Sequence, residues 1–298
     1  MSHLGPLHAV HRVPSGARRG PTVVLLHGIG LGAWLWERDQ GVLADLGLES
    51  WALDLPGHGP QAGQDVRLEA CYRQVARALD ELEGPVALVG HSAGGLVAQV
   101  LSSERTLSGL VLVGAVPCAE VVHLPTAIGA RLFAPLLPSF MLGRNLRMGE
   151  RAYLETGLAR LSPEEQRAVL ARIGPWPCGM VRDIARRRPT VPRGSVDCPV
   201  LITHGFLDRV ASLYGSRLLA DHYGAVMWRF DDVGHMPQVE PAGERHARAV
   251  GEWLLAPSRP RVREVDAFRP AEGVGEGERR ARSTRPVRSD SRFGDRWR

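Results

Sequence analysis

The stretch Gly90-His91-Ser92-Ala93-Gly94 surrounds a serine with the features of a catalytic nucleophile. An apolar run at 86–89 precedes it and predicts a strand, and the run at 95–103 predicts a helix. A serine on a sharp turn between a strand and a helix forms a nucleophile elbow. The flanking glycines remove side chains that would collide in so tight a turn. The stretch therefore predicts that the Ser92 hydroxyl projects from the end of a strand.

The helix predicted after Ser92 would also favour acyl transfer. The first N–H groups of a helix have no partner within the helix, and they point toward the turn that precedes it. Such donors stabilise the oxyanion that develops when a nucleophile attacks a carbonyl. One short segment thus predicts a nucleophile and half of an oxyanion hole.

A serine nucleophile needs a histidine to take its proton and a carboxylate to orient that histidine. An apolar run at 199–205 predicts a strand, with Asp208 in the loop after it. A second run at 226–230 predicts another strand, and His235 lies in the next loop. We expect His235 to be the base and Asp208 its orienting partner. The alternatives are that Asp208 caps a helix beginning near Ser212 and that His235 is an ordinary loop histidine.

Four landmarks in a fixed order make the chain resemble the α/β-hydrolase superfamily over about residues 20–256. They are His27-Gly28-Ile29-Gly30 after a predicted strand, Asp54-Leu55-Pro56-Gly57-His58-Gly59, the elbow at Ser92, and the loops carrying Asp208 and His235. The resemblance implies that Ser92 is the nucleophile, His235 the general base and acid, and Asp208 the partner of His235. It also implies an oxyanion hole made by the backbone N–H groups of Ile29 and Ala93. This chemistry needs no cofactor and no metal.

Three neighbouring features have structural readings. The glycines around Ile29 could simply form a tight turn, and they do not match a phosphate-binding motif because the motif's lysine is missing. Asp54 and His58 lie four residues apart, but Pro56 and Gly57 between them predict a structural turn. For His91 we expect a packing role, with its side chain pointing away from the Ser92 hydroxyl.

Apolar runs that alternate with helix-like stretches predict an α/β-hydrolase fold, with a mostly parallel central sheet flanked by helices. The expected strands are 23–26, 50–53, 86–89, 109–113, 200–203 and 226–230, and the expected helices are 36–44, 69–82, 95–103, 214–222 and 244–255. Between about 120 and 190 no convincing strand occurs, which predicts an inserted helical cap. The predicted parts are an N-terminal extension (1–19), the first part of the core (20–118), the cap (119–192), the second part of the core (193–256) and a tail (257–298).

Two segments of the predicted cap stand out, one as a helix start and one as a possible lining of a pocket. Ser162-Pro163-Glu164-Glu165 predicts a helix start, with a serine cap and proline in the first turn. The amphipathic segment 125–142 either packs onto the core or lines an apolar acyl pocket. Trp34, Trp36 and Trp176 are further pocket candidates, with core packing as the alternative for each.

Composition bears on partners and compartment. The chain has no lysine, and from Pro257 onward 12 Arg face 7 Asp and Glu, so the whole formal excess of +5 lies in the tail. Few apolar residues occur there, which predicts disorder. We expect no nucleic-acid and no membrane partner, although the tail's charge leaves both open. The four cysteines show no disulfide or zinc pattern, and 1–20 has no continuous apolar run, so a cytoplasmic location is expected.

These features predict a capped serine hydrolase that cleaves an ester-type bond of a small, apolar acyl substrate through an acyl-enzyme on Ser92. Carboxylic esters, thioesters, lactones and carbon–carbon bonds all remain possible targets. One alternative is a non-hydrolytic enzyme of the same fold, such as an acyltransferase, cyclase or lyase. Another is a ligand receptor with an idle triad. The sequence leaves the oligomeric state open.

Overall fold

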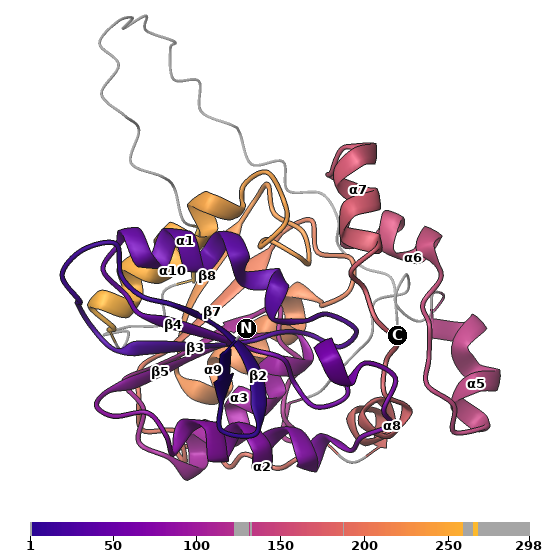
Figure 1. Ribbon diagram of the computed structural model, residues 1–298, viewed down its shortest axis with the longest axis horizontal. Coiled ribbons are helices and arrows are strands. Elements are labelled where there is room, and N and C mark those ends of the chain that lie inside the picture. The colour runs from indigo at the N-terminus through magenta and orange to yellow at the C-terminus, as the bar shows by residue number, and fades with distance from the viewer. Residues whose placement is uncertain (1, 122–130, 132, 187, 259–264, 268–298) are drawn as a thin grey trace, which may run out of the picture. The chain divides into compact units, whose positions relative to one another are not determined.

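A nine-stranded sheet forms the centre of the protein (Figure 1). The computed structural model describes residues 2–121, 131, 133–186 and 188–258, and the backbone of 265–267. The order of strands is β1-β2-β4-β3-β5-β6-β7-β8-β9. The β1–β2 and β2–β4 pairs are antiparallel, and every other neighbouring pair is parallel. The predicted fold class, with a mostly parallel sheet, is confirmed.

All six predicted strands are present, at their predicted places. The strands are β1 (Ser2–Leu4), β2 (Leu7–Arg12), β3 (Thr22–Leu26), β4 (Ser50–Leu53), β5 (Val86–His91), β6 (Gly109–Val113), β7 (Val200–Gly205), β8 (Val226–Phe230) and β9 (Val265–Ala267). Strands β3, β5, β6 and β7 are buried along their whole length. Central parallel strands are covered on both faces, which is why they are continuous apolar runs in the sequence.

The hairpin β1–β2 adds an edge to the sheet that the sequence analysis did not predict. It lies within 1–19, the segment expected to be an N-terminal extension. Leu4, Leu7 and Ala9 are buried, whereas the residues between them are polar or partly exposed. Gly5 makes the turn at φ +55°. So short a half-buried alternation gives a weak local signal, and its pairing with β4 depends on tertiary structure.

Helices cover both faces of the sheet. The core helices are α1 (Glu37–Asp45), α2 (Leu68–Leu79), α3 (Ala93–Glu104), α9 (Leu213–Tyr223) and α10 (Gly243–Leu255), with the short 3₁₀ segments η1 (Ala33–Trp36) and η2 (Gly59–Gln61). Side chains alternate along β3: Val24 and Leu26 pack in the cluster of α2, α3 and α9, while Val23 and Leu25 pack in that of α1 and α10. Figure 1 shows these two groups of helices on opposite sides of the sheet.

Helices also occur in the described part of the segment between β6 and β7, where the cap is predicted. They are η3 (Ala134–Leu136), α5 (Leu137–Met141), α6 (Glu150–Glu155), α7 (Pro163–Leu170) and α8 (Cys178–Arg186). The predicted helix start at Ser162 is confirmed, because the Ser162 and Glu165 side chains form a reciprocal capping box. Of the amphipathic segment 125–142, residues 125–130 and 132 lie outside the described residues. The bounds 119–192 stay a prediction.

The tail predicted to be disordered lies mostly outside the described residues. Within it, Val265–Ala267 form β9, which pairs in parallel with β8. These three residues thus differ from the expected disorder, since their backbone joins a sheet edge. No helix in the described part of the chain has the length and apolar character needed to cross a bilayer.

Candidate active site

Ser92 occupies the one-residue turn between β5 and α3. Its backbone has φ +51° and ψ −119°, and it is the only non-glycine residue with positive φ in the described ranges. This conformation is strained for a residue with a Cβ atom. Backbone hydrogen bonds hold it there: the Ser92 N–H donates to Val113 O at 3.0 Å, and Ser92 O accepts from Val116 N at 3.0 Å. The expected elbow geometry is therefore present at Ser92.

The glycines around Ser92 are needed because backbone lies directly against them. A Cβ atom on Gly90 would lie 2.6 Å from Gly95 Cα, and one on Gly94 would lie 2.4 Å from His27 O. Real Cβ atoms do not approach backbone so closely, so a larger residue would force strands and helix apart. Gly94 thus lets the end of β3 lie against the elbow.

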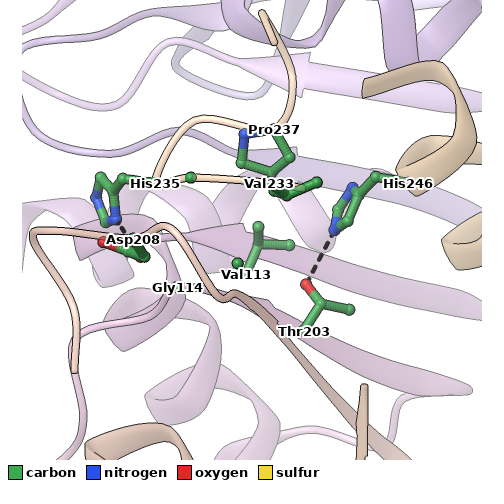
Figure 2. A pocket seen from close by; sticks show the side chains of 10 residues that line it. Val113, Gly114, Thr203, Asp208, Val233, His235, Pro237 and His246 are labelled. Atoms are coloured by element: carbon green, nitrogen blue, oxygen red, sulfur yellow. Dashed lines mark hydrogen bonds and ion pairs between the residues drawn. The ribbon is translucent and has the colours of Figure 1, made fainter. Parts of the chain in front are cut away.

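Asp208 and His235 form a hydrogen-bonded pair at the ends of β7 and β8. Asp208 Oδ2 lies 2.8 Å from His235 Nδ1 (Figure 2). Asp208 Oδ1 accepts from the N–H groups of Val210 at 2.7 Å and Ala211 at 2.9 Å. The helix α9 is capped by Ser212 instead, so the alternative role of Asp208 as its cap is wrong. Each carboxylate oxygen of Asp208 has a donor.

Asp208 and His235 shift each other's pKa, the carboxylic acid downward and the imidazole upward. Burial alone would raise the pKa of Asp208, but His235 and the backbone donors outweigh burial and lower it. Burial alone would lower the pKa of His235, but the Asp208 carboxylate outweighs burial and raises it. Because an ionised carboxylate only accepts, His235 Nδ1 carries the proton and donates it. Nε2 is then left unprotonated and able to accept a proton from a nucleophile.

His91 supports the His235 loop rather than only packing beside it. Its ring lies 4.9 Å from the His235 ring, and its Nε2 donates to His235 O at 2.9 Å. Burial lowers the pKa of His91 to about 3, with a further contribution from His235, so the ring is neutral. A neutral ring places no positive charge against the imidazolium that catalysis would form. The expected packing role was therefore incomplete, because hydrogen bonding across 144 residues leaves no local signal.

Gly114 joins the elbow to the pair. It follows β6 at φ +50°, and a Cβ atom there would lie 3.2 Å from Asp208 Oδ2 and 3.3 Å from His235 Nδ1. The preceding residue, Val113, accepts the Ser92 N–H. Adjacent residues at the end of β6 thus contact the Ser92 backbone and the Asp208–His235 pair. In the described contacts no hydrogen bond joins Ser92 Oγ to His235, and that contact stays a prediction.

The loop after β3 passes directly against Ser92. A Cβ atom on Gly28 would lie 3.0 Å from Ser92 Cβ. The next residue, Ile29, donates its N–H to no acceptor that the structure describes. Ala93 is the first residue of α3, so its N–H has no acceptor within the helix. These two N–H groups are the ones predicted to bind an oxyanion.

The segment 54–59 holds this loop, which supports its structural reading. His58 Nε2 accepts the Gly30 N–H at 3.0 Å, and Asp54 Oδ1 accepts the Ala33 N–H at 2.7 Å. His27 Nε2 accepts the Leu55 N–H at 3.0 Å. Burial lowers the pKa of both His27 and His58, which keeps their ring nitrogens free to accept. In the described residues no group of three or more His, Cys, Asp or Glu is placed to hold a metal.

The cap contacts the same loop through Trp176. The Trp176 ring packs on Gly30, where a Cβ atom would lie 2.3 Å from Nε1, and that nitrogen donates to the Tyr153 hydroxyl at 2.9 Å. Gly174 N–H donates to Gly30 O at 2.8 Å. Of the three tryptophans named as pocket candidates, Trp176 packs on Gly30 and Trp34 on Gly32 of this loop, whereas Trp36 is 2% exposed in the core.

Comparisons with known proteins agree with this architecture. The model of the alpha/beta hydrolase family matches residues 23–250. Monoglyceride lipase from Mus musculus is 26% identical over 224 residues, which cover 70% of this chain and 71% of that protein. Pimeloyl-(acyl-carrier protein) methyl ester esterase from Aromatoleum aromaticum is 28% identical over 233 residues, covering 73% and 92%. The crystal structure of Paleococcus ferrophilus monoacylglycerol lipase superposes with a TM-score of 0.65 at 23% identity, covering 85% and 99%, which shows a shared fold.

Proposed function

We propose that this chain, which belongs to the alpha/beta hydrolase family, hydrolyses an ester-type bond of a small, apolar acyl substrate through an acyl-enzyme on Ser92. It is an α/β-fold serine hydrolase of the esterase and lipase type. The observation that carries the proposal is the buried Asp208–His235 pair, held by the same end of β6 that holds the strained Ser92 backbone.

In the first half-reaction, Ser92 Oγ attacks the carbonyl carbon of the substrate. His235 Nε2 takes the hydroxyl proton as the new C–O bond forms, and Asp208 stabilises the resulting imidazolium. The carbonyl oxygen becomes an oxyanion that accepts hydrogen bonds from the Ile29 and Ala93 N–H groups. The imidazolium then protonates the leaving alcohol or thiol, which departs and leaves the acyl group on Ser92.

In the second half-reaction, water attacks the acyl-enzyme. His235 takes a proton from the water and returns it to Ser92 Oγ when the tetrahedral intermediate collapses. The products are a carboxylic acid and the regenerated enzyme. Every proton in this cycle passes through one ring nitrogen, so the cycle needs no metal and no organic cofactor.

An apolar acyl group is favoured by what surrounds Ile29. Its side chain packs against a cluster formed by cap residues, as does Trp176. The buried members of this cluster are Leu136, Phe140, Leu146, Cys178 and Val181. We expect apolar side chains beside an oxyanion hole to favour an acyl chain, since burying each methylene is worth about 0.8 kcal/mol. The names of two relatives, monoglyceride lipase and pimeloyl-(acyl-carrier protein) methyl ester esterase, also refer to acyl esters.

The test is hydrolysis of p-nitrophenyl esters of graded chain length by the purified protein, beside a matched thioester series. We expect turnover of at least one series, a preference for one chain length, and labelling of the wild type by a fluorophosphonate probe. Ser92→Ala must remove both turnover and labelling, whereas the control Ser103→Ala, at the end of α3, must keep both. Labelling that persists in Ser92→Ala would refute the proposed nucleophile.

The same experiment separates the alternatives. A labelled Ser92 without net hydrolysis, together with acyl transfer to an added alcohol or amine, would indicate a non-hydrolytic enzyme of this fold. Tight binding of an ester without labelling or turnover would indicate a receptor.

We expect the protein to act in the cytoplasm. Its four cysteines are present as thiols, which is consistent with a reducing compartment; they are Cys71, Cys118, Cys178 and Cys198.

A further inference from the structure

Glu240 is buried beside the candidate catalytic histidine, although the mechanism above does not use it. It lies between β8 and α10 and is 1% exposed. Its Oε2 accepts the Gly234 N–H at 2.7 Å, and its Oε1 lies 3.4 Å from the Met236 N–H. The carboxylate therefore holds the residues immediately before and after His235.

The fit around this carboxylate is close. A Cβ atom on Gly234 would lie 2.6 Å from Glu240 Oε1, so a larger residue at 234 would displace the carboxylate. On the other side of the loop, His91 Nε2 donates to His235 O at 2.9 Å. Two buried side chains thus fix three consecutive residues, and Asp208 fixes the ring. An imidazole held at this many points has little freedom to turn away from a nucleophile.

The cap supplies the positive charge that pairs with the Glu240 carboxylate. Arg160 lies between α6 and α7, and its Nε is 3.7 Å from Glu240 Oε2. Two further contacts join this part of the cap to the catalytic loops. Gly157 packs on Met236, where a Cβ atom would lie 2.7 Å from Sδ, and Arg209 Nη1 donates to Glu155 O at 3.2 Å.

We propose that Glu240 is a positioning residue for His235, and that Arg160 couples the cap to the catalytic loop by acting on Glu240. The proposal rests on the function proposed above. A carboxylate is suited to this place because it accepts two N–H groups at once and also stabilises a positive charge on His235. An arginine is suited to the cap because it compensates the buried negative charge that would otherwise be costly. Displacing the cap would then weaken the support of the base.

Other charged and titratable groups face this loop. They are Arg38, whose Nη1 donates to Glu240 O, and His91, Arg160, His204, Asp208 and His246. Burial lowers the pKa of His235, Asp208 raises it, and the Glu240 carboxylate raises it further. Burial raises the pKa of Glu240, whereas the Gly234 and Met236 N–H groups and Arg160 lower it. While Glu240 is ionised, removing its charge must lower the pKa of His235, and removing the opposite charge of Arg160 must raise it.

The experiment compares Glu240→Gln and Arg160→Gln with the wild type. Glutamine keeps the size of glutamate but offers one acceptor, so one N–H loses its partner. We expect Glu240→Gln to lower kcat roughly 10- to 100-fold with KM nearly unchanged, because the base is displaced while the residues proposed to contact the acyl group are unchanged. On the acid side of the pH profile, the midpoint at which kcat/KM falls (the acid limb) must lie at lower pH in Glu240→Gln than in the wild type. In Arg160→Gln it must lie at higher pH. The control Glu244→Gln, whose exposed carboxylate lies 3.7 Å from Arg248, must leave kcat and the limb unchanged.

An unchanged kcat in Glu240→Gln would overturn the positioning role. A lowered kcat in Glu240→Gln with an unmoved acid limb would show a merely structural role, and would also overturn the positioning role. An acid limb that stays in place in Arg160→Gln would overturn the coupling of Arg160 to the catalytic loop. NMR titration of the His235 ring in the same three variants measures the charge coupling without any turnover. If the wild type proves inactive and unlabelled, the proposed function fails, and this titration still decides whether Glu240 and Arg160 act on His235.

Discussion

Replacing Ser92 by glycine should stabilise the protein relative to replacing it by alanine. Both changes remove the hydroxyl, so any effect of Oγ on stability cancels between them. They differ in the Cβ atom, which alanine keeps at φ +51° and ψ −119°. Alanine must therefore retain the backbone strain of the elbow, and glycine must lose it.

The size of the effect follows from two opposing contributions. A non-glycine residue in a sparsely populated backbone region costs about 1–3 kcal/mol. Glycine loses more conformational freedom on folding, which costs about 0.5–1 kcal/mol relative to alanine. The central values of the two contributions differ by about 1 kcal/mol, which is the net gain we expect for Ser92→Gly over Ser92→Ala. For a domain of this size, that corresponds to a rise in Tm of about 2–4 °C.

Urea denaturation followed by circular dichroism measures this difference as a change in midpoint at constant slope. Ser103 provides a matched control, because it lies in α3 with an ordinary helical backbone. There the order must reverse, with Ser103→Gly less stable than Ser103→Ala by about 1 kcal/mol. If Ser92→Gly is no more stable than Ser92→Ala while the control behaves as expected, the strain assigned to the elbow does not exist.

Three further predictions concern the pair and the glycines. Asp208→Asn should lower kcat by about 10³- to 10⁴-fold, because the amide favours the wrong His235 tautomer. In steady-state assays the exposed Asp231→Asn serves as the control, and an equal loss of kcat in both variants would contradict the role of Asp208. Because the pKa of His235 is raised and the base must be unprotonated, kcat/KM should fall as the pH drops, with a midpoint above the ordinary histidine value of 6.5. A midpoint below 6.5 in a pH–rate profile would contradict the raised pKa of the base. Gly94→Ala should destabilise the protein by about 1–3 kcal/mol in urea denaturation, because the new methyl group would meet His27 O at 2.4 Å; unchanged stability would mean that the elbow and β3 separate freely.

Local sequence was enough to predict most of the core. The six runs predicted as strands are β3 to β8. Four of them, β3, β5, β6 and β7, are buried on both faces and so stand out as apolar runs in the sequence. Helix α7 was predictable for a different local reason, since a serine cap and an acid three residues later satisfy each other's backbone. The hairpin β1–β2 was not predicted, because a short polar edge strand is stabilised by its partner rather than by its own residues.

Some residues of the candidate site were likewise predictable from the local sequence, and others were not. Ser92, Asp208 and His235 were named from the sequence because each lies in the turn or loop after a recognisable strand. Parallel strands bring their carboxyl ends to one edge of the sheet. The Asp208–His235 hydrogen bond follows from that placement. The roles of His91, Gly114 and Glu240 were not predicted. Each depends on a contact with a loop from another part of the fold.

The sequence by itself thus determined six strands along the chain, the core helices between and after them and the residue types that follow the strands, because backbone propensity and burial act over a few neighbouring residues. Tertiary structure alone decided which buried groups support the base and how the cap reaches it. Hydrogen bonds and ion pairs such as Arg160–Glu240 join residues 80 positions apart, and their strength depends on a distance and a burial that exist only once the chain has packed.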